Sequence, residues 1–301
     1  MKKAIIVMLA LLSQNLQAQP PVGQFRIPQT PIDSTTLKVV SVGNVTMTVS
    51  PQTGGKVLSL KYDGQEVISQ SRFPESFGST FWTSPQKEWN WPPVPEYDKQ
   101  PYKVVQRDDS RLVIESGVSE RMKYRIGKDF QVDKKRGGFI VTYTIENMSN
   151  ETRSVAPWEI TRVPNGGIIF FDAQADKITP AGLMAFENAY GAAWYKADAT
   201  NENRKVNADA RGWLAFANNG LLLLKKFEDL NEGQPAPGEA EVQVYVNRGT
   251  SYIELESQGA YTQLAPGQKL TWSVRWNLVP VKQADGPSKA LMKIVKKSGL
   301  F

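Results

Sequence analysis

One short segment of the sequence carries two carboxylates and an amide at alternating positions. Residues 252–258 read YIELESQ, so a strand here places Glu254, Glu256 and Gln258 on one face, with Tyr252 beside them. Carboxylate and amide oxygens accept hydrogen bonds from hydroxyl groups, and a carboxylate can also act as a general base. The pattern therefore predicts a polar stripe that binds hydroxyl groups, although a strand surface that only faces solvent would show the same spacing.

A second cluster lies at residues 157–162, which read PWEITR and precede the turn residues PNGG. Trp158, Glu159 and Arg162 offer an indole face, a carboxylate and a guanidinium within one predicted strand. If burial raises the pKa of Glu159, its protonated carboxyl could act as a general acid while Glu256 acts as a general base. We therefore expect all three side chains to join the ligand-binding set.

Aromatic residues are concentrated between residues 73 and 102. This window of thirty residues holds eight aromatic residues and six of the nineteen prolines, so it predicts a long, stiff loop without a central strand. Flat rings stack on the C–H faces of sugars, which makes a carbohydrate platform one interpretation. The alternative is a satellite core that closes one end of the fold. The rings expected to bind a ligand are those of Trp82, Trp89, Trp91 and Tyr97.

The 301 residues include no histidine and no cysteine. Their absence excludes disulfides, thiolate metal sites, cysteine nucleophiles, a Ser-His-Asp triad and the HExxH zinc motif. No acidic loop has EF-hand spacing, so we expect neither a metal nor a cofactor. Any chemistry must use carboxylates, Lys, Arg, Tyr or Ser side chains.

Period-two alternation of apolar and polar residues runs through most of the chain and predicts half-buried antiparallel strands. It is clearest at residues 45–50, 139–146, 242–247 and 272–278. Turn residues separate such segments at Asp63-Gly64, 108–110 and 218–220. So many strands cannot form one open twisted sheet, and we expect an all-β fold with two large stacked antiparallel sheets. Helical spacing occurs only in residues 288–297.

These patterns divide the chain into four segments. Residues 1–18 combine a basic start, a short apolar run and a small residue before the cut, which is typical of a secretory signal peptide. Residues 19–37 predict a loose leader, 38–284 a single β domain, and 285–301 a helix and tail. The apolar run is too short for a membrane span, and no cysteine is present for lipid attachment. We expect an exported protein, periplasmic or extracellular.

The order of features resembles the galactose mutarotase-like domains of the aldose 1-epimerase superfamily. The opening hairpin, residues 53–64 (TGGKVLSLKYDG), and the closing segments 255–259 (LESQG), 264–268 (LAPGQ) and 272–276 (WSVRW) carry the resemblance. It implies a β-supersandwich with a sugar-sized groove on its concave face. In the sugar mutarotases a Glu of the Leu-Glu-x-Gln motif is the general base, and Glu256 occupies that position here.

The acid partner of that base is a histidine in those enzymes, and this chain has none. Trp158 stands in the corresponding region, as in the secreted, uncharacterised bacterial branch that the sequence also resembles. We therefore expect a secreted carbohydrate-binding protein without epimerase activity. A divergent sugar-active enzyme, epimerase or glycoside-processing, with Glu256 as base is one alternative. An envelope scaffold that binds protein partners is the other.

The expected partners follow from charge and site. Without Lys2 and Lys3 the formal charge falls from +6 to +4, which is too small and scattered to indicate nucleic acid binding. We expect a carbohydrate ligand, no nucleic acid and no membrane span. Glu256 is the catalytic candidate. The expected ligand-binding residues are Trp82, Trp89, Trp91, Tyr97, Trp158, Glu159, Arg162, Glu254 and Gln258.

Overall fold

The computed structural model describes residues 33–72, 76–249 and 251–298. The predicted signal peptide and the leader up to residue 32 lie outside these ranges and remain predictions. No helix in the described ranges combines the length and the apolar character needed to cross a membrane.

The first sheet carries ten described strands, all antiparallel to their neighbours. Its order is β1-β2-β3-β5-β10-β18-β17-β14, with β4 paired to β3 and β19 paired to β10. The strands are β1 (Lys38–Val42), β2 (Val45–Ser50), β3 (Lys56–Tyr62), β4 (Gln65–Glu66), β5 (Ser79–Ser84), β10 (Arg153–Val163), β14 (Arg204–Ala208), β17 (Val242–Val246), β18 (Ile253–Gln258) and β19 (Thr262–Leu264).

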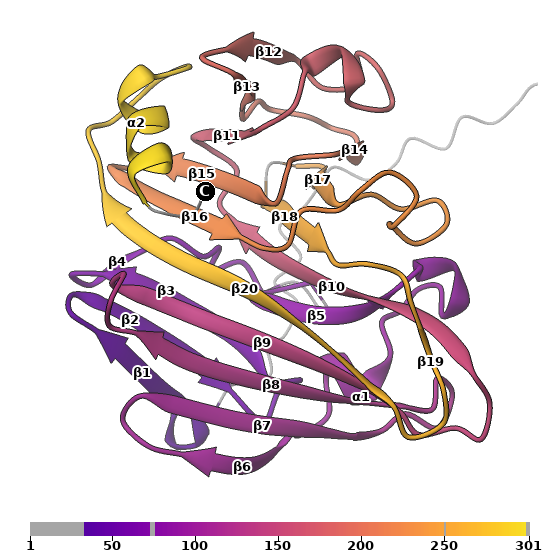
Figure 1. The fold of residues 1–301 in the computed structure, drawn as a ribbon. Coiled ribbons are helices and arrows are strands. Elements are labelled where there is room, and N and C mark those ends of the chain that lie inside the picture. The colour runs from indigo at the N-terminus through magenta and orange to yellow at the C-terminus, as the bar shows by residue number, and fades with distance from the viewer. Residues whose placement is uncertain (1–32, 73–75, 250, 299–301) are drawn as a thin grey trace, which may run out of the picture. The chain divides into compact units, whose positions relative to one another are not determined.

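The second sheet also has ten described strands, in the order β12-β13-β11-β15-β16-β20-β9-β8-β7-β6. Its strands are β6 (Lys103–Arg107), β7 (Arg111–Val118), β8 (Tyr124–Asp133), β9 (Gly138–Asn147), β11 (Ile168–Phe171), β12 (Phe186–Ala189), β13 (Ala192–Lys196), β15 (Trp213–Asn218), β16 (Leu221–Lys226) and β20 (Lys269–Pro280). The long strand β20 lies between β16 and β9 and extends from the lower right to the upper left in Figure 1. The expected all-β fold with two large antiparallel sheets is confirmed.

The core lies between the two sheets, where alternate residues of each strand meet. Phe81 of β5 stacks on Tyr143 of β9 with ring centroids 4.3 Å apart, so Phe81 marks the inward face of the first sheet. Leu255 of β18 and Val244 of β17 belong to the same buried cluster. Side chains that alternate with these therefore point away from the second sheet.

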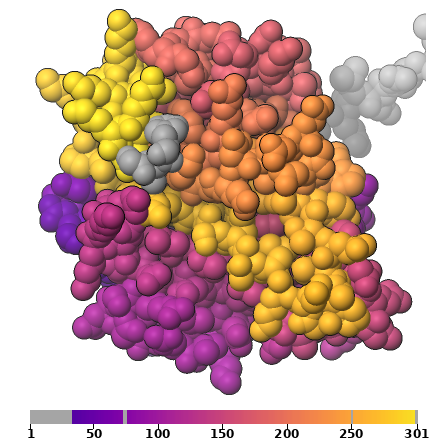
Figure 2. Space-filling view, viewed as in Figure 1, coloured from indigo at the N-terminus to yellow at the C-terminus, as the bar shows by residue number. Residues whose placement is uncertain are grey.

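Short helices cover parts of the sandwich. The expected C-terminal helix is confirmed as α2 (Lys289–Lys297), whose N-cap Ser288 accepts a hydrogen bond from the Leu291 amide. Its apolar residues pack on the outer side of β11, β13, β15 and β16, and Figure 2 shows it at the upper left of the molecule, in yellow. The other helices are η1 (Ser34–Thr36), η2 (Gln86–Glu88), α1 (Pro95–Asp98) and η3 (Ala175–Lys177).

The aromatic window 73–102 differs from its prediction as a continuous loop. Residues 79–84 form the central strand β5, which pairs with β10 and is buried along its whole length. The prolines of the window flank this segment and leave it free of proline, so its amides can join the ladder. The loop begins only at Pro85.

Candidate ligand-binding groove

A cavity of about 400 Å³ lies on the outward face of the first sheet, over β5, β10, β18, β17 and β14. Strand pairing explains which side chains reach it. Trp158 pairs with Trp82 across β10 and β5, and Tyr245 pairs with both Glu254 and Lys205 across β17 and its neighbours, so these residues share one face. The cavity is lined by Ser76, Trp82, Gln86, Trp91, Trp158, Lys205, Tyr245, Asn247, Tyr252 and Glu254.

Three indoles form one wall of this groove. The Trp82 ring meets Trp158 and Trp91 edge to face, with centroids 5.4 and 6.1 Å apart. Trp91 is 55% exposed, whereas Trp82 and Trp158 are buried. The wall thus presents one free ring backed by two fixed rings, which favours stacking against a ligand.

Two aromatic residues expected at the site lie beneath it instead. The Trp89 indole is buried and donates a hydrogen bond to the Thr83 carbonyl at 2.7 Å. The Tyr97 hydroxyl is buried and donates to the Tyr124 carbonyl at 3.2 Å. The Trp89 ring backs the wall, with its centroid 5.5 Å from that of Trp82 and 6.2 Å from that of Trp158. Trp89 and Tyr97 both belong to the main buried cluster, and neither lines the groove.

The loop that carries Trp91 is held from two sides. The backbone amide of Gln86 donates a hydrogen bond to the Glu239 carboxylate at 3.0 Å. Arg121, between β7 and β8 of the other sheet, donates to the Trp89 carbonyl at 2.7 Å and to the Glu88 carbonyl at 3.2 Å. These contacts fix both ends of the turn that precedes Trp91.

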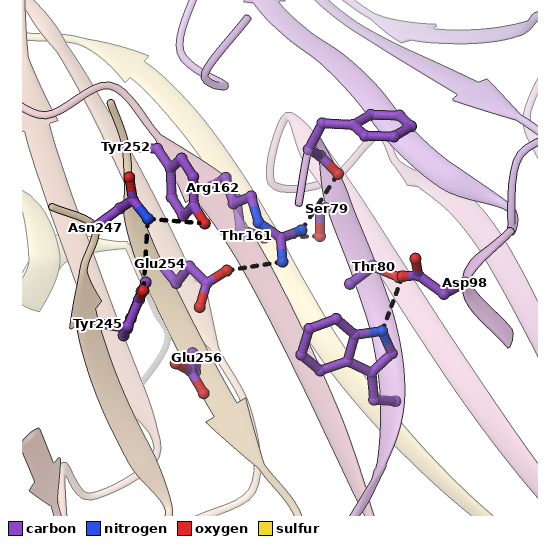
Figure 3. Close-up of polar contacts among 12 residues, drawn as sticks. Ser79, Thr80, Asp98, Thr161, Arg162, Tyr245, Asn247, Tyr252, Glu254 and Glu256 are labelled. Carbon is purple, nitrogen blue, oxygen red and sulfur yellow. Dashed lines mark hydrogen bonds and ion pairs between the residues drawn. The ribbon is translucent and has the colours of Figure 1, made fainter. Parts of the chain in front are cut away.

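One end of the groove is built from hydrogen-bonding side chains (Figure 3). The expected binding residue Arg162 is buried and does not line the cavity; it lies behind this end. Its guanidinium pairs with the Glu254 carboxylate at 2.7 Å and lies 5.7 Å from the ring centres of both Trp82 and Tyr252. The Asn247 amide lies 3.4 Å from the Tyr252 hydroxyl and 3.5 Å from that of Tyr245. Burial raises the pKa of Tyr252 to about 12, so its hydroxyl stays protonated at neutral pH.

Glu256 lies at the floor, next to the groove. Its Oε2 accepts hydrogen bonds from the Trp158 indole at 2.9 Å and from the Lys205 ammonium at 3.0 Å. Its Oε1 has no hydrogen-bond partner among the described residues, and the residue is only 1% exposed. Burial raises the pKa of Glu256 to about 7. The positive charge of Lys205 acts against this increase, and the negative charge of the neighbouring Glu254 raises the pKa further.

Glu159 faces the interior of the sandwich, not the groove, which corrects the expectation that it joins the site. Its carboxylate accepts two hydrogen bonds from Lys225 of β16, at 2.5 and 2.7 Å. Ser79 and Thr161 donate to the same carboxylate at 2.9 and 2.6 Å. Adjacent residues of a strand point to opposite faces, so Trp158 and Glu159 cannot both line one groove.

Gln258 supports the groove without lining it. Its side-chain carbonyl accepts a hydrogen bond from Ser84 at 2.6 Å. Its amide group donates to Gln243 at 3.2 Å and to Glu239 at 3.3 Å. The residue therefore connects β5, β17 and β18 with the carboxylate that holds the Trp91 loop.

Several groove residues were not selected from the sequence. Tyr245 and Asn247 lie on the polar side of the alternating segment 242–247, in phase with Glu254, so the period-two pattern contained a signal for them. Lys205 reaches the groove only because β14 pairs with β17, and no local pattern indicates that pairing. Ser76 and Gln86 complete the set, and Tyr252, which the sequence placed beside the polar stripe, also lines the cavity.

Three carboxylates lie close enough together to hold a metal ion, those of Asp209, Asp229 and Glu241. None of the three lines the groove. Glu241 is buried, and its two oxygens already accept hydrogen bonds from the amides of Gly212 and Leu230 at 2.6 and 3.0 Å. Burial raises the pKa of Glu241 to about 7. Its contacts are those of a structural carboxylate.

Two ten-stranded antiparallel sheets with a groove on one outward face define a galactose mutarotase-like fold. Solved structures of this class align over most of the chain, among them a candidate aldose 1-epimerase from Escherichia coli K12, with 14% identity, 82% of this chain and 99% of the other covered, and a TM-score of 0.60. A galactose mutarotase-like protein from Lactobacillus casei ATCC 334 aligns with 11% identity, coverage of 81% and 100%, and a TM-score of 0.58. At these identities the likeness establishes the fold.

The family is identified more specifically by the sequence. Residues 36–279 match the domain of unknown function DUF4380, and the chain belongs to this family. Among curated proteins, none matches the sequence.

Proposed function

We propose that the protein binds a carbohydrate in the groove of the first sheet, without epimerase activity. The observation that carries the proposal is the composition of one cavity: three indoles on one wall and a cluster of hydrogen-bonding groups at its end. Indole faces stack on sugar C–H groups, while carboxylate, amide and phenol groups bind hydroxyls. The volume of about 400 Å³ lies within the range of roughly 300–1,000 Å³ that small-molecule sites occupy.

The proposal of binding without turnover is supported by the polar groups at the floor. The chain has no histidine to protonate a ring oxygen. Glu256 is almost fully buried, and Lys205, which lines the groove, is bound to it. A bound sugar therefore meets Lys205 before it meets the carboxylate.

Calorimetric titration with monosaccharides and short oligosaccharides tests this proposal. Binding that weakens about tenfold in Trp91→Ala and is kept in Trp91→Phe supports the groove, because phenylalanine retains a flat ring. Val105→Ala, on an exposed position of β6, is the matched control. If no sugar class produces heat, carbohydrate binding is wrong. The proposal includes export, which mass spectrometry of the mature N-terminus checks.

A second candidate function, a sugar-active enzyme, is favoured by one observation. Glu256 keeps one oxygen without a hydrogen-bond partner in the part of the chain that the structure describes, and its pKa of about 7 suits a general base at neutral pH. Polarimetry of freshly dissolved aldoses distinguishes this candidate. Accelerated mutarotation that Glu256→Gln abolishes would establish catalysis, whereas an uncatalysed rate with intact binding would exclude it for those sugars.

A further inference from the structure

The groove holds two ion pairs that differ in which partner a ligand can reach. In the Arg162–Glu254 pair both side chains are shielded, with 1% and 11% exposed. In the Lys205–Glu256 pair the glutamate side chain is 1% exposed and the lysine side chain 33% exposed, and Lys205 is the member of the pair that lines the cavity. Lys205 is therefore the one of these two cations that can exchange its partner for a ligand group while both carboxylates stay in place.

The chemistry of an ammonium decides which ligand group succeeds in that exchange. If a neutral hydroxyl took the place of the Glu256 carboxylate, the Lys205 ammonium would exchange a hydrogen bond to a charged acceptor for a weaker one to a neutral acceptor. A ligand carboxylate would instead give Lys205 a hydrogen bond between two charged groups, like the one that it loses. Lys205 also lies 4.7 Å from the centre of the Trp158 ring, so the ammonium sits where a sugar stacked on the aromatic wall would present a ring substituent.

The release of Lys205 has a consequence for the carboxylate that it leaves. Glu256 would keep only the Trp158 indole as a donor, in a buried site beside a second carboxylate, Glu254. The charged and titratable groups that face it from the packed strands are Lys205, Glu254, Arg162 and Tyr245, and Arg162 is already paired with Glu254. A buried carboxylate without a cation takes up a proton.

Resting on the proposed function, we propose that the groove selects an acidic saccharide, such as a uronic acid, whose carboxylate binds Lys205 while Glu256 takes up one proton. The charges balance, because the ligand brings one negative charge and the proton one positive charge. The ligand carboxyl stays ionised, since its ordinary pKa lies far below neutral pH. Glu256 acts here as a proton-binding group and forms no bond to the sugar.

Titration calorimetry with matched sugar pairs tests the selection. The probes are D-glucose with D-glucuronate, D-galactose with D-galacturonate, and D-mannose with D-mannuronate, at pH 6 and pH 8. For at least one pair we expect the acid to bind at least tenfold more tightly than the neutral sugar at pH 6. Its affinity should fall about tenfold by pH 8, because the pKa of about 7 leaves Glu256 mostly ionised there. Titrations in buffers of different ionisation enthalpy should show uptake of nearly one proton per ligand at pH 8 and little at pH 6, where Glu256 already holds most of its proton.

Two variants locate the effect. In Glu256→Gln the partner of Lys205 is neutral at every pH, so the acidic sugar should bind at pH 8 as tightly as the unmodified protein binds it at pH 6. In Lys205→Met the preference for the acid should disappear. Lys103→Met, an exposed lysine of β6, removes the same charge and should change nothing.

The outcomes separate this inference from the function on which it rests. Equal binding of acidic and neutral sugars, or a preference that survives in Lys205→Met, overturns the inference and leaves carbohydrate binding intact. Failure of all six sugars and of the neutral oligosaccharides counts against the groove as a sugar site. The proton count needs no variant, so a misfolded variant does not leave the inference undecided.

Discussion

Two carboxylates on neighbouring strands of the same sheet have opposite surroundings. Glu159 of β10 and Glu256 of β18 each pair with a lysine whose ammonium lies over an indole, Lys225 over Trp276 and Lys205 over Trp158. Four side chains donate hydrogen bonds to the Glu159 carboxylate, whereas Glu256 keeps one oxygen without a described partner.

The difference between the two pairs follows from the face of the sheet. The Glu159 pair lies between the sheets, where both groups are shielded and a lost bond cannot be replaced by water. The Glu256 pair lies beside the groove, where a ligand can replace one of its bonds. One arrangement therefore holds the sandwich together, and the other is available for binding.

The first of two equally large effects that we expect comes from breaking the interior pair. Lys225→Met leaves the Glu159 charge buried without its cation, which should lower the free energy of unfolding by about 3–5 kcal/mol. In Lys205→Met the Glu256 carboxyl can take up a proton, which its raised pKa favours near pH 7, so the loss should be smaller, about 1 kcal/mol. Urea unfolding at pH 7 measures both. Equal losses in the two variants would contradict the distinction between an interior and a groove pair.

A smaller effect, of opposite sign, should appear at Glu256. Its pKa in the folded protein is raised from 4.5 to about 7, so between these values the folded state binds more protons than the unfolded state. Stability from this group is therefore complete at low pH and falls as pH rises from 4.5 to 7, by about 3 kcal/mol in total. Glu256→Gln removes the titration.

The comparison of unfolding free energies at two pH values checks this sign. The Gln variant should match the unmodified protein near pH 4 and exceed it in stability by up to about 3 kcal/mol at pH 8. Taking the difference between the two proteins cancels the other titrating groups, among them Glu241, whose pKa is also raised to about 7. A variant that is less stable at pH 8 would show that Glu256 stabilises the fold as an anion.

Two tryptophans separated by one residue test the same distinction, because Trp89 supports the fold and Trp91 is expected to contact the ligand. Trp89→Ala empties a buried site and should lower the free energy of unfolding by about 3–5 kcal/mol when measured by urea unfolding. Trp91→Ala removes an exposed ring, so stability should change by less than about 0.5 kcal/mol. Sugar affinity in Trp91→Ala should fall about tenfold, or about 1.4 kcal/mol. A Trp91→Ala variant that binds sugars normally would remove this ring from the groove.

Much of the fold and part of the site follow from period-two patterns. The alternation in residues 252–258 correctly places Glu254, Glu256 and Gln258 on one face. The same rule separates Trp158 and Arg162, four positions apart, from Glu159, so assigning all three to one groove contradicted the pattern itself. The prediction for residues 73–102 failed because proline content was averaged over a window that contains a proline-free strand.

Other features depend on pairing between distant segments. Lys205 and Lys225 have ordinary sequence surroundings, and they meet their carboxylates through contacts that span 51 and 66 residues. The burial of Trp89 and the exposure of Trp91 likewise depend on how the loop folds back onto β5. Such contacts are set by tertiary packing, for which a local pattern carries no signal.

The smallest effect that we expect concerns a residue that never touches the ligand. Arg121 holds the Glu88 and Trp89 carbonyls from the second sheet, and its loss should let the Trp91 loop sample more conformations. Arg121→Met should weaken sugar binding by about threefold, or roughly 0.7 kcal/mol, and lower unfolding free energy by less than about 1 kcal/mol. Arg121→Lys can still donate to one carbonyl and should restore part of the affinity. Calorimetry on the two variants measures this, and an affinity unchanged in Arg121→Met would mean that Glu239 and the buried Trp89 alone hold the groove wall in place.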